Sequence, residues 1–449
     1  MKILRELFRS KGGIHPASRK RATAAMPVEN MPLSKVFFVS MVQHMGAPAR
    51  PIVKKGDAVM RGQVLGEAGG YVSAPVHAPT SGKVIALGER PTQAGLPAVC
   101  VEIETDGADR WDPAIQPGPD WKTMEPKVLV ERIVTAGIVG MGGAGFPTHV
   151  KLLPPAGKTI DTLIINGAEC EPYLTADLRL MVEMPQSVWT GAQIVRQILG
   201  ARRIVMAIED NKPDAIQAMR AVMQATDAEL VVLKTKYPQG AEKQLIYAVT
   251  GREVPSGGLP MAVGALVENV GTCAAIYETI TAGRPLTERI VTVTGAMIRT
   301  PKNLRVRIGA PLSDLAAFCG GMAGQPGKIV CGGPMMGLAQ GSLETAVTKT
   351  TSGVVLLPRQ AVQQFSSMPC ISCGRCVSAC PMRLMPNTLG EMIEADDIEG
   401  AEGLDVMDCI ECGACAYECP AHRPLVQHMR RAKAEIAKQR REKETANKG

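Results

Sequence analysis

Eight cysteines near the C-terminal end of the chain form two copies of one spacing. Cys-x2-Cys-x2-Cys-x3-Cys-Pro runs from Cys370 to Pro381 and again from Cys409 to Pro420. A [4Fe–4S] cluster needs four thiolates, and this spacing supplies three of them from one short hairpin. In two-cluster ferredoxin-type domains the fourth cysteine of each copy binds the other cluster. The pattern therefore predicts two [4Fe–4S] clusters and a chain that carries single electrons.

The exchange of fourth cysteines defines two ligand sets. One cluster is expected to be bound by Cys370, Cys373, Cys376 and Cys419. The other is expected to be bound by Cys409, Cys412, Cys415 and Cys380. Zinc is the alternative, since paired Cys-x2-Cys units also make four-thiolate zinc sites. The Cys-Pro ending, present twice, favours iron and sulfide. The remaining cysteines lack ligand spacing and are expected to be small core residues: Cys100, Cys170, Cys273, Cys319 and Cys331.

A glycine-rich segment, GMGGAGFPT at 140–148, could bind a phosphate. It contains G-x-G-x-x-G, but the dinucleotide-binding fingerprint requires a preceding strand, and 128–135 has helical spacing. A glycine loop that opens onto a helix over 147–153 can still direct backbone N–H groups at a phosphate. A tight structural turn is the alternative. Phe146 could cover a flat ring, and Lys151, one turn into the helix, could reach a phosphate.

Alternating strands and helices must position that loop. Buried strands are predicted at 162–165, 203–208 and 229–233, and helices at 128–135, 184–199, 213–223 and 241–249. Parallel sheets of this kind bind ligands beyond the carboxyl ends of their strands. The segment NGAECEP at 166–172 occupies such a position. The sequence therefore predicts an α/β binding domain over 120–285.

The other regions differ in composition. A basic N-terminal arm over 1–31 precedes short β-type runs over 32–115, which predict a small sandwich or barrel with His77 in a turn. These runs resemble the barrel-sandwich fold of lipoyl and biotinyl domains, but no lysine lies between Glu67 and Pro79 to carry the cofactor. A docking or structural role is expected instead. Further β-rich sequence spans 286–358, with a loop at 332–337 expected to contact a neighbouring element, and the cysteine region spans 359–428.

Composition excludes some function classes. At 449 residues the chain is expected to form three or four domains. It has no apolar run long enough for a membrane span and no secretory signal, and reduced cysteines favour the cytosol. The net charge is +7, with eight Lys or Arg against three Glu in a basic helical tail at 429–449. Such a tail can meet an anionic surface or remain solvated. With 3% aromatic residues, nucleic-acid binding is not expected.

The glycine loop and NGAECEP together resemble the flavin- and NADH-binding subunit family of respiratory complex I. The resemblance implies that Phe146 and Glu171 face NADH. It implies flavin contacts from Gly140, Gly142, Gly143, Gly145, Lys151, Asn166, Glu169, Gly240, Glu242, Asn269 and Thr272. The sequence departs from that family at Ala168, Ala241 and Glu268, where Asp, Glu and Asn are usual. The flavin pocket is therefore expected to be less polar at one edge.

The order of the blocks resembles the RnfC family, the peripheral subunits of Rnf ion-translocating complexes. KGGIHP at 11–16 and VHAPTSGKV at 76–84 carry this resemblance beyond the flavin block. It implies a multidomain α/β plus β protein: a barrel-sandwich domain, an α/β FMN- and NADH-binding domain, a β-grasp module and a helical two-cluster ferredoxin-like domain. It also implies a peripheral place on the cytoplasmic side of the membrane, with other Rnf subunits as partners and ferredoxin reached through the complex. The family's activity is reversible NADH oxidation coupled to translocation of Na+ or H+.

The chemistry of the blocks fits together. NADH gives two electrons at once, whereas an iron–sulfur cluster accepts one. FMN can take a pair and release its electrons singly, so a flavin site beside two clusters suits transfer between NAD+/NADH and a one-electron carrier. Two alternatives stay open. One is a cobalamin-reductase-like flavin and iron–sulfur protein, and the other is a cluster relay or scaffold with a degenerate flavin pocket.

Overall fold

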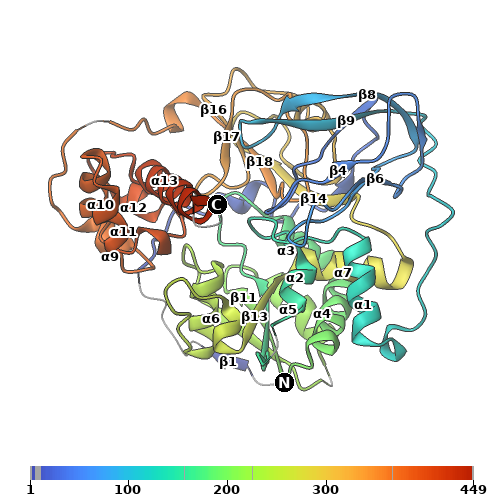
Figure 1. Ribbon diagram of the computed structural model, residues 1–449, viewed down its shortest axis with the longest axis horizontal. Helices are drawn as coiled ribbons and strands as arrows, with labels where there is room; N and C mark the ends of the chain where they lie inside the picture. Colours follow the sequence, from blue (N-terminus) through green and yellow to red (C-terminus); the bar gives the residue numbers. More distant parts are fainter. Residues whose placement is uncertain (1–2, 6–11, 156, 225, 367, 447–449) are drawn as a thin grey trace.

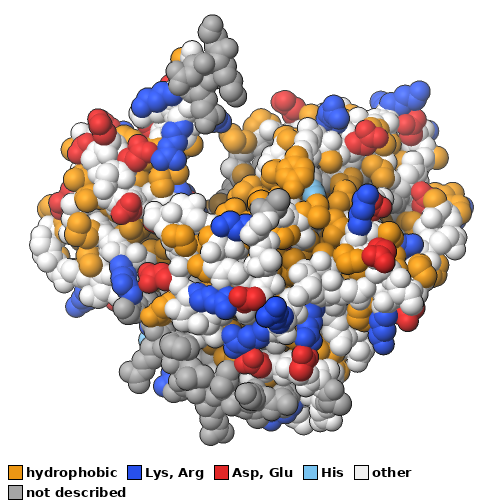
Figure 2. Space-filling view, turned by 60° about the horizontal axis from the view of Figure 1, so that its bottom comes forward, with side chains coloured by type: hydrophobic (Ala, Val, Ile, Leu, Met, Phe, Trp, Pro, Cys, Tyr) orange, Lys and Arg blue, Asp and Glu red, His pale blue; other side chains and the backbone are white. Residues whose placement is uncertain are grey.

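The structure, a computed structural model, describes residues 3–5, 12–155, 157–224, 226–366 and 368–446. Four sheets and a helical lobe make a multidomain architecture, as expected. Figure 1 shows the β-rich part beside an α/β part, with the helical lobe to one side. A notch separates the lobe from the rest of the molecule in the space-filling view of Figure 2. Among the described residues, no helix combines the length and apolar character needed to cross a membrane.

A five-stranded parallel sheet forms the centre of the α/β part. Its strands are β1 (Ile3–Arg5), β10 (Thr162–Gly167), β11 (Arg203–Glu209), β12 (Glu229–Leu233) and β13 (Ala265–Asn269). Their order is β1-β12-β11-β10-β13, and every neighbouring pair is parallel. The central strands are covered on both faces, which explains their continuous apolar sequences. The three strands predicted in this region are confirmed.

Helices cover both faces of this sheet. They are α1 (Pro126–Thr135), α2 (Thr148–Leu152), α3 (Ala176–Glu183), α4 (Pro185–Leu199), α5 (Pro213–Val222), α6 (Glu242–Thr250) and α7 (Val270–Ala282). Apolar residues of α6 pack on one face, and those of α4, α5 and α7 join the large core on the other. The four predicted helices are confirmed. Short 3-10 helices lie at η1 (Lys20–Ala22), η2 (Trp121–Thr123), η3 (Pro260–Val263), η4 (Arg359–Ala361) and η5 (Val406–Asp408).

Two small antiparallel sheets follow the N-terminal segment. They contain β3 (Val36–Ser40), β4 (Arg50–Pro51), β5 (Ala58–Val59), β6 (Val64–Glu67), β7 (Val76–His77), β8 (Gly82–Pro91) and β9 (Pro97–Thr105). The orders are β3-β9-β8-β5 and β4-β6-β7, and Phe37, Leu65 and Ile103 are buried between them. This is the small β sandwich that the sequence predicts. The expectation of a turn at His77 was wrong, since its side chain is buried at the end of β7.

A six-stranded mixed sheet makes the second β-rich unit. It is formed by β2 (Val28–Asn30), β14 (Glu288–Thr294), β15 (Lys302–Arg307), β16 (Lys328–Cys331), β17 (Leu338–Gln340) and β18 (Gly353–Leu357), with α8 (Leu312–Phe318) packed against it. The order is β17-β16-β18-β14-β15-β2. The β-rich sequence noted over 286–358 contains β14 to β18 of this sheet.

The N-terminal segment is part of two sheets. Strand β1 pairs with β12, and β2 pairs with β15, both in parallel. The basic N-terminal arm predicted over 1–31 therefore contributes an edge strand to each of two sheets in its described part. Residues 1–2 and 6–11 of that arm, including Lys11 of KGGIHP, and 447–449 of the basic tail lie outside the described residues.

The cysteine region folds as a helical lobe. Its helices are α9 (Arg375–Ala379), α10 (Pro386–Glu394), α11 (Ile398–Gly403), α12 (Ala414–Glu418) and α13 (Leu425–Ala446). The basic tail continues α13, and Met429, Ala432 and Ile436 place this helix in the core of the lobe. Lys433 pairs with Glu411 at 2.6 Å. The tail helix is thus an integral element of the lobe.

Lys349 links three parts of the chain behind the glycine loop. Its side chain is 1% exposed, and its Nζ donates to the carbonyl oxygens of Pro75 and Gly137, each at 2.7 Å. Burial lowers the pKa of Lys349 to about 7. The Lys349 side chain thereby joins the six-stranded sheet to the barrel sandwich and to the α/β part. No motif in the sequence marks this residue.

We expect Lys349→Met to lower the melting temperature, because two buried carbonyl groups lose their donor at a cost of about 1–3 kcal/mol. The folded-state pKa lies below the unfolded value, so the unfolded chain binds more protons between pH 7 and pH 10, and wild-type stability rises with pH there. The difference in melting temperature should therefore grow between pH 7 and pH 9. Lys328→Met, a half-buried lysine of β16, is the control. A pH-independent difference would contradict this assignment.

Candidate functional site

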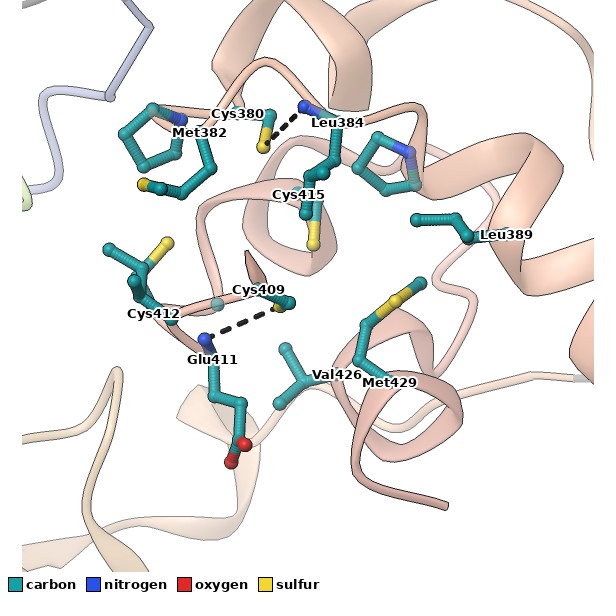
Figure 3. A pocket seen from close by; sticks show the side chains of 14 residues that line it. Cys380, Met382, Leu384, Leu389, Cys409, Glu411, Cys412, Cys415, Val426 and Met429 are labelled. Carbon is teal, nitrogen blue, oxygen red and sulfur yellow. Dashed lines mark hydrogen bonds between the residues drawn. The ribbon is translucent and has the colours of Figure 1, made fainter. Parts of the chain in front are cut away.

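Four cysteines from both motif copies surround one cavity in the lobe. Its lining includes Cys380, Cys409, Cys412 and Cys415, together with Leu384, Leu389, Val426 and Met429. Figure 3 shows the four cysteines around this space, with Cys380 and Cys409 across from each other and Cys412 and Cys415 on either side. The structure therefore brings together one predicted ligand set, including its exchanged fourth cysteine.

Three of the other four cysteines lie close together. Cys376 is buried and close to Cys370 and Cys419: burial raises the pKa of its thiol, and the charges of these two neighbours raise it further. Cys373 is exposed. Arg423, only 3% exposed, lies beside Cys370 and pairs with Glu394. Its place three residues after Pro420 gave no indication of this contact in the sequence.

The backbone turns of the two copies match. Ser372 and Glu411, each between the first two cysteines of its motif, both have φ of 55°. This turn lets the N–H of Ser372 donate to the sulfur of Cys370, and that of Glu411 to the sulfur of Cys409, each at 3.4 Å. Such N–H groups offset negative charge on cluster sulfurs.

The donor set fits iron–sulfur clusters. Burial raises the pKa of the Cys412 thiol to about 12, so a thiolate in this apolar cavity requires a cation beside it. Four sulfurs arranged around a space, with backbone N–H groups directed at them, suit a cube of iron and sulfide.

The glycine loop lies beyond the carboxyl ends of β10 and β13. Its ends are held by the N–H of Gly140, which donates to the carbonyl oxygen of Phe146 at 2.9 Å. A Cβ at Gly142 would lie 2.8 Å from Nδ2 of Asn269, whereas one at Gly143 would meet nothing within 4 Å. Gly145 has φ of 69° and packs against Thr350 and His44. The loop thus presents bare backbone at the binding edge of the sheet.

Side chains at the ends of the two strands support this loop. Asn269 caps α7 by accepting the N–H of Gly271 at 2.8 Å and donates to Asp177 at 2.8 Å. The hydroxyl of Thr272, on the first turn of α7, accepts the N–H of Met141 at 3.0 Å. These contacts bring the glycine loop and the N-terminus of a 13-residue helix together, a suitable place for a phosphate.

Asn166 lies at the end of β10 beside Gly240. Its Nδ2 donates to the carbonyl oxygen of Gly240 at 2.9 Å, and its Oδ1 accepts the N–H of Ala168 at 3.1 Å. The carbonyl oxygen of Ala168 accepts from the buried Lys212 at 2.5 Å. Ala168 is one of the positions at which the sequence departs from the complex I pattern. The buried Lys212 lies behind it, a contact that the sequence did not indicate.

Lys151 and Glu242 are brought together, although 91 residues separate them. The Nζ of Lys151 lies 3.2 Å from Glu242 and 3.8 Å from Glu268, and it donates to the carbonyl oxygen of Val267 at 2.5 Å. Burial alone would lower the pKa of Lys151, but the carboxylates of Glu268 and Glu242 outweigh it and raise the pKa. Glu268 thus supplies a buried partner for the lysine.

The predicted contacts Glu169 and Glu171 are held by distant segments. Glu169 accepts the N–H of Asp177 at 2.8 Å. Glu171 accepts the N–H groups of Met335 at 3.1 Å and Met336 at 2.7 Å, so the loop expected to contact a neighbouring element does so. Burial raises the pKa of Glu171 to about 7, although these N–H groups oppose the shift. The buried Lys20 donates to the carbonyl oxygens of Glu169 at 2.8 Å and Glu171 at 2.9 Å, a role that the sequence did not indicate.

The cysteine cavity and the glycine-loop domain meet at Tyr237. Its hydroxyl donates to the carbonyl oxygen of Cys412 at 2.6 Å. Three residues later, Gly240 contacts Asn166, and a Cβ there would lie 3.3 Å from the sulfur of Cys170. Ile14 and Ala414 pack into the same cluster. The Tyr237 side chain and three residues of backbone therefore join the cavity to the predicted flavin contacts.

Comparison with family models matches most of the chain in sequence order. The models are an RnfC barrel sandwich hybrid domain at residues 8–108, a Nuo51 FMN-binding domain at 133–278, an SLBB domain at 290–339 and a 4Fe-4S dicluster domain at 369–423. The first three fall on the barrel sandwich, the parallel-sheet domain and the six-stranded sheet, and the fourth falls on the lobe.

Curated relatives match nearly the whole chain. A subunit of the proton-translocating ferredoxin:NAD(+) oxidoreductase complex of Clostridium ljungdahlii is 48% identical over 95% of this chain and 93% of its own length. The equivalent subunit of the Na(+)-translocating complex of Acetobacterium woodii is 46% identical over 96% of this chain and 98% of its own. That of an ion-translocating oxidoreductase complex of Rhodobacter capsulatus is 44% identical over 97% of this chain and 85% of its own.

Proposed function

We propose, from the premise that the chain belongs to the RnfC family of ion-translocating ferredoxin:NAD+ oxidoreductase complexes, that it is the NADH-oxidising electron-transfer subunit of such a complex. The observation that carries this function is the junction at Tyr237, which joins the glycine-loop domain to a cavity of four thiols. A two-electron site and one-electron sites in direct contact are what transfer between NAD+/NADH and ferredoxin requires.

The cofactors are FMN and two [4Fe–4S] clusters, as the matching domain models state. FMN, when bound, supplies the conversion of a hydride's electron pair into single electrons. We propose that Gly142, Gly143 and Asn166 bind beside its ring, and that the N-terminus of α7 with Thr272 faces its phosphate. The cavity-lining cysteines and the second quartet hold the clusters in the ligand sets that the motif spacing predicts.

The chain's own residues orient the reactants. Asn269 and Thr272 fix the glycine loop against α7, and Lys151 with its two carboxylates holds α2 against β13 and α6. Positioning of this kind can supply much of the lowering of the activation barrier for a transfer step. Neither an acid nor a base on the protein is needed for hydride transfer.

The two cysteine quartets occupy different positions relative to the flavin domain. Cys412 contacts Tyr237 of that domain, whereas Cys370 is half-buried and Cys373 is exposed. We infer that the quartet with Cys412 is proximal to NADH oxidation and the quartet with Cys373 is distal. The chain's place is inferred to be peripheral, on the cytoplasmic side of the membrane, with the other subunits of the complex as partners.

A cofactor inventory of the isolated full-length chain tests this function. We expect about eight iron atoms, matching acid-labile sulfide and one FMN per chain, consistent with two four-iron clusters and one flavin. Zinc in place of iron would exclude the cluster assignment. Iron without flavin would favour a cluster relay over NADH oxidation.

Replacement of Phe146 by alanine tests the proposed NADH contact. Loss of ring stacking costs about 0.5–1.5 kcal/mol, so we expect the KM for NADH to rise about three- to tenfold with flavin content unchanged. Steady-state NADH oxidation with an artificial acceptor measures this effect. Phe365→Ala, an exposed phenylalanine before the lobe, is the control. An unaltered KM in Phe146→Ala would remove the stacking role.

A further inference from the structure

Equivalent residues of the two cysteine motifs lie in different surroundings. Ile410 follows the first cysteine of the second copy and packs with Ile14, Tyr237 and Cys412 against the flavin domain. Ile371 holds the same position in the first copy and is 64% exposed. The repeat thus contains one covered face and one uncovered face.

The pattern extends to the next positions of the motif. Cys412 is buried, whereas its counterpart Cys373 is exposed. Ala414 is 0% exposed, whereas Arg375, at the matching position, is exposed. The backbone turns of the two copies are alike, so the difference lies in what each copy meets and not in how it folds.

The covered face shows what such a surface does. Its centre is apolar, and the hydroxyl of Tyr237 donates to the carbonyl oxygen of Cys412. An ionic contact at its edge joins Lys243 to Asp408 at 3.6 Å. The cysteine cavity therefore lies directly against the flavin domain, the domain with which its cluster would exchange electrons.

The uncovered face has matching properties on the outside of the molecule. We call residues 368–375 the outer face; Met368 is 62% exposed in it, beside Ile371, Cys373 and Arg375. Figure 1 shows the chain before α9 running along the outer side of the lobe, away from the rest of the molecule. Met368 and Ile371 are two large apolar side chains exposed three residues apart beside Cys373. Arg375 is the only charged residue of this segment.

We propose that the outer face docks the one-electron carrier subunit of the complex that exchanges electrons with this chain. The inference rests on the proposed function. A partner face with an apolar centre and a carboxylate opposite Arg375 would cover the outer face and bring its cofactor next to Cys373. Only a redox partner gains from approaching an exposed cluster ligand, which favours this occupant over a second copy of the chain or a lipid surface.

The test uses Ile371→Glu and Arg375→Glu in the full-length, cofactor-loaded chain. Leu96→Glu, at an exposed hairpin tip with 72% exposure, and Lys55→Glu, an exposed lysine of the barrel sandwich, are the matched controls. We measure binding to the complex depleted of this subunit, and the rate at which NADH reduces that complex. We expect each outer-face variant to weaken binding about tenfold or more, as central interface residues do, and to slow reduction, while the controls stay within about twofold of wild type.

Cluster reduction by NADH in the isolated variants separates the two proposals. We expect it to be unchanged, because the flavin domain and the covered face are intact. Normal binding and normal transfer in both outer-face variants would overturn the docking proposal, as would variants that alter only self-association of the chain in sedimentation. Failure of NADH to reduce the clusters of the wild-type chain would instead refute the proposed function.

Discussion

Replacing Cys380 with alanine is expected to abolish reduction of both clusters by NADH, whereas replacing Cys419 should leave one cluster reducible. Cys380 belongs to the first motif but lines the cavity of the second, next to the contact between Tyr237 and Cys412. Its loss should empty the proximal site. Cys419 lies with Cys370 and Cys376, so its loss should empty the distal site only. Each variant should retain about half of the iron.

Anaerobic EPR after addition of NADH measures this difference, and flavin bleaching serves as the internal control. Both variants keep the flavin domain, so the flavin should bleach fully in each. The matched pair isolates the exchange of fourth cysteines, because both changes remove a Cys-Pro cysteine from the same repeat position. The reverse result, with Cys419→Ala blocking the NADH-reducible cluster, would show that each motif binds its own cluster.

Gly142→Val is expected to lower FMN affinity at least tenfold and to reduce stability. A Cβ at Gly142 would lie 2.8 Å from Nδ2 and 2.9 Å from Cβ of Asn269. Asn269 caps α7, and the loss of a cap costs about 1 kcal/mol. Displacing Asn269 would separate the glycine loop from the helix terminus that we propose faces the flavin phosphate. Flavin content and melting temperature are the measurements.

Gly143→Ala separates cofactor binding from folding. A Cβ at Gly143 meets nothing within 4 Å in the protein, so the melting temperature of the flavin-free chain should be unchanged. A flavin ring against this backbone would still meet the new methyl group, and FMN affinity should fall. Gly88→Ala, also without neighbours within 4 Å, should change neither quantity. Normal FMN affinity in both loop variants would place the flavin away from the glycine loop.

The elements with strong local patterns could be predicted from the sequence. Continuous apolar runs at 162–165 and 203–208 became β10 and β11, and the helical spacing at 184–199 became α4. Strands β1 and β2 could not be predicted, because each has three residues and exists only through pairing with a distant partner. The basic N-terminal arm was therefore predicted without its two strands.

The candidate site shows the same division. Motif spacing alone indicated that Cys380 lies with the second copy, and the structure places it on that cavity. The partners of Lys151 could not be foreseen, since Glu242 lies 91 residues away. Likewise, the N–H groups that bind Glu171 come from the loop between β16 and β17, 164 and 165 residues along the chain. Buried lysines such as Lys20 and Lys212 leave no pattern in a sequence, because a single lysine makes each contact without any spacing motif around it.

The central claim is that one chain converts the electron pair of NADH into single electrons on two clusters. Anaerobic titration of the full-length, cofactor-loaded protein with NADH tests it most directly, with absorbance and EPR followed in the same samples. We predict that flavin absorbance bleaches and that signals of reduced [4Fe–4S] clusters appear as NADH is added. Clusters that stay oxidised while dithionite still reduces them, or a flavin that does not respond to NADH, would contradict the account.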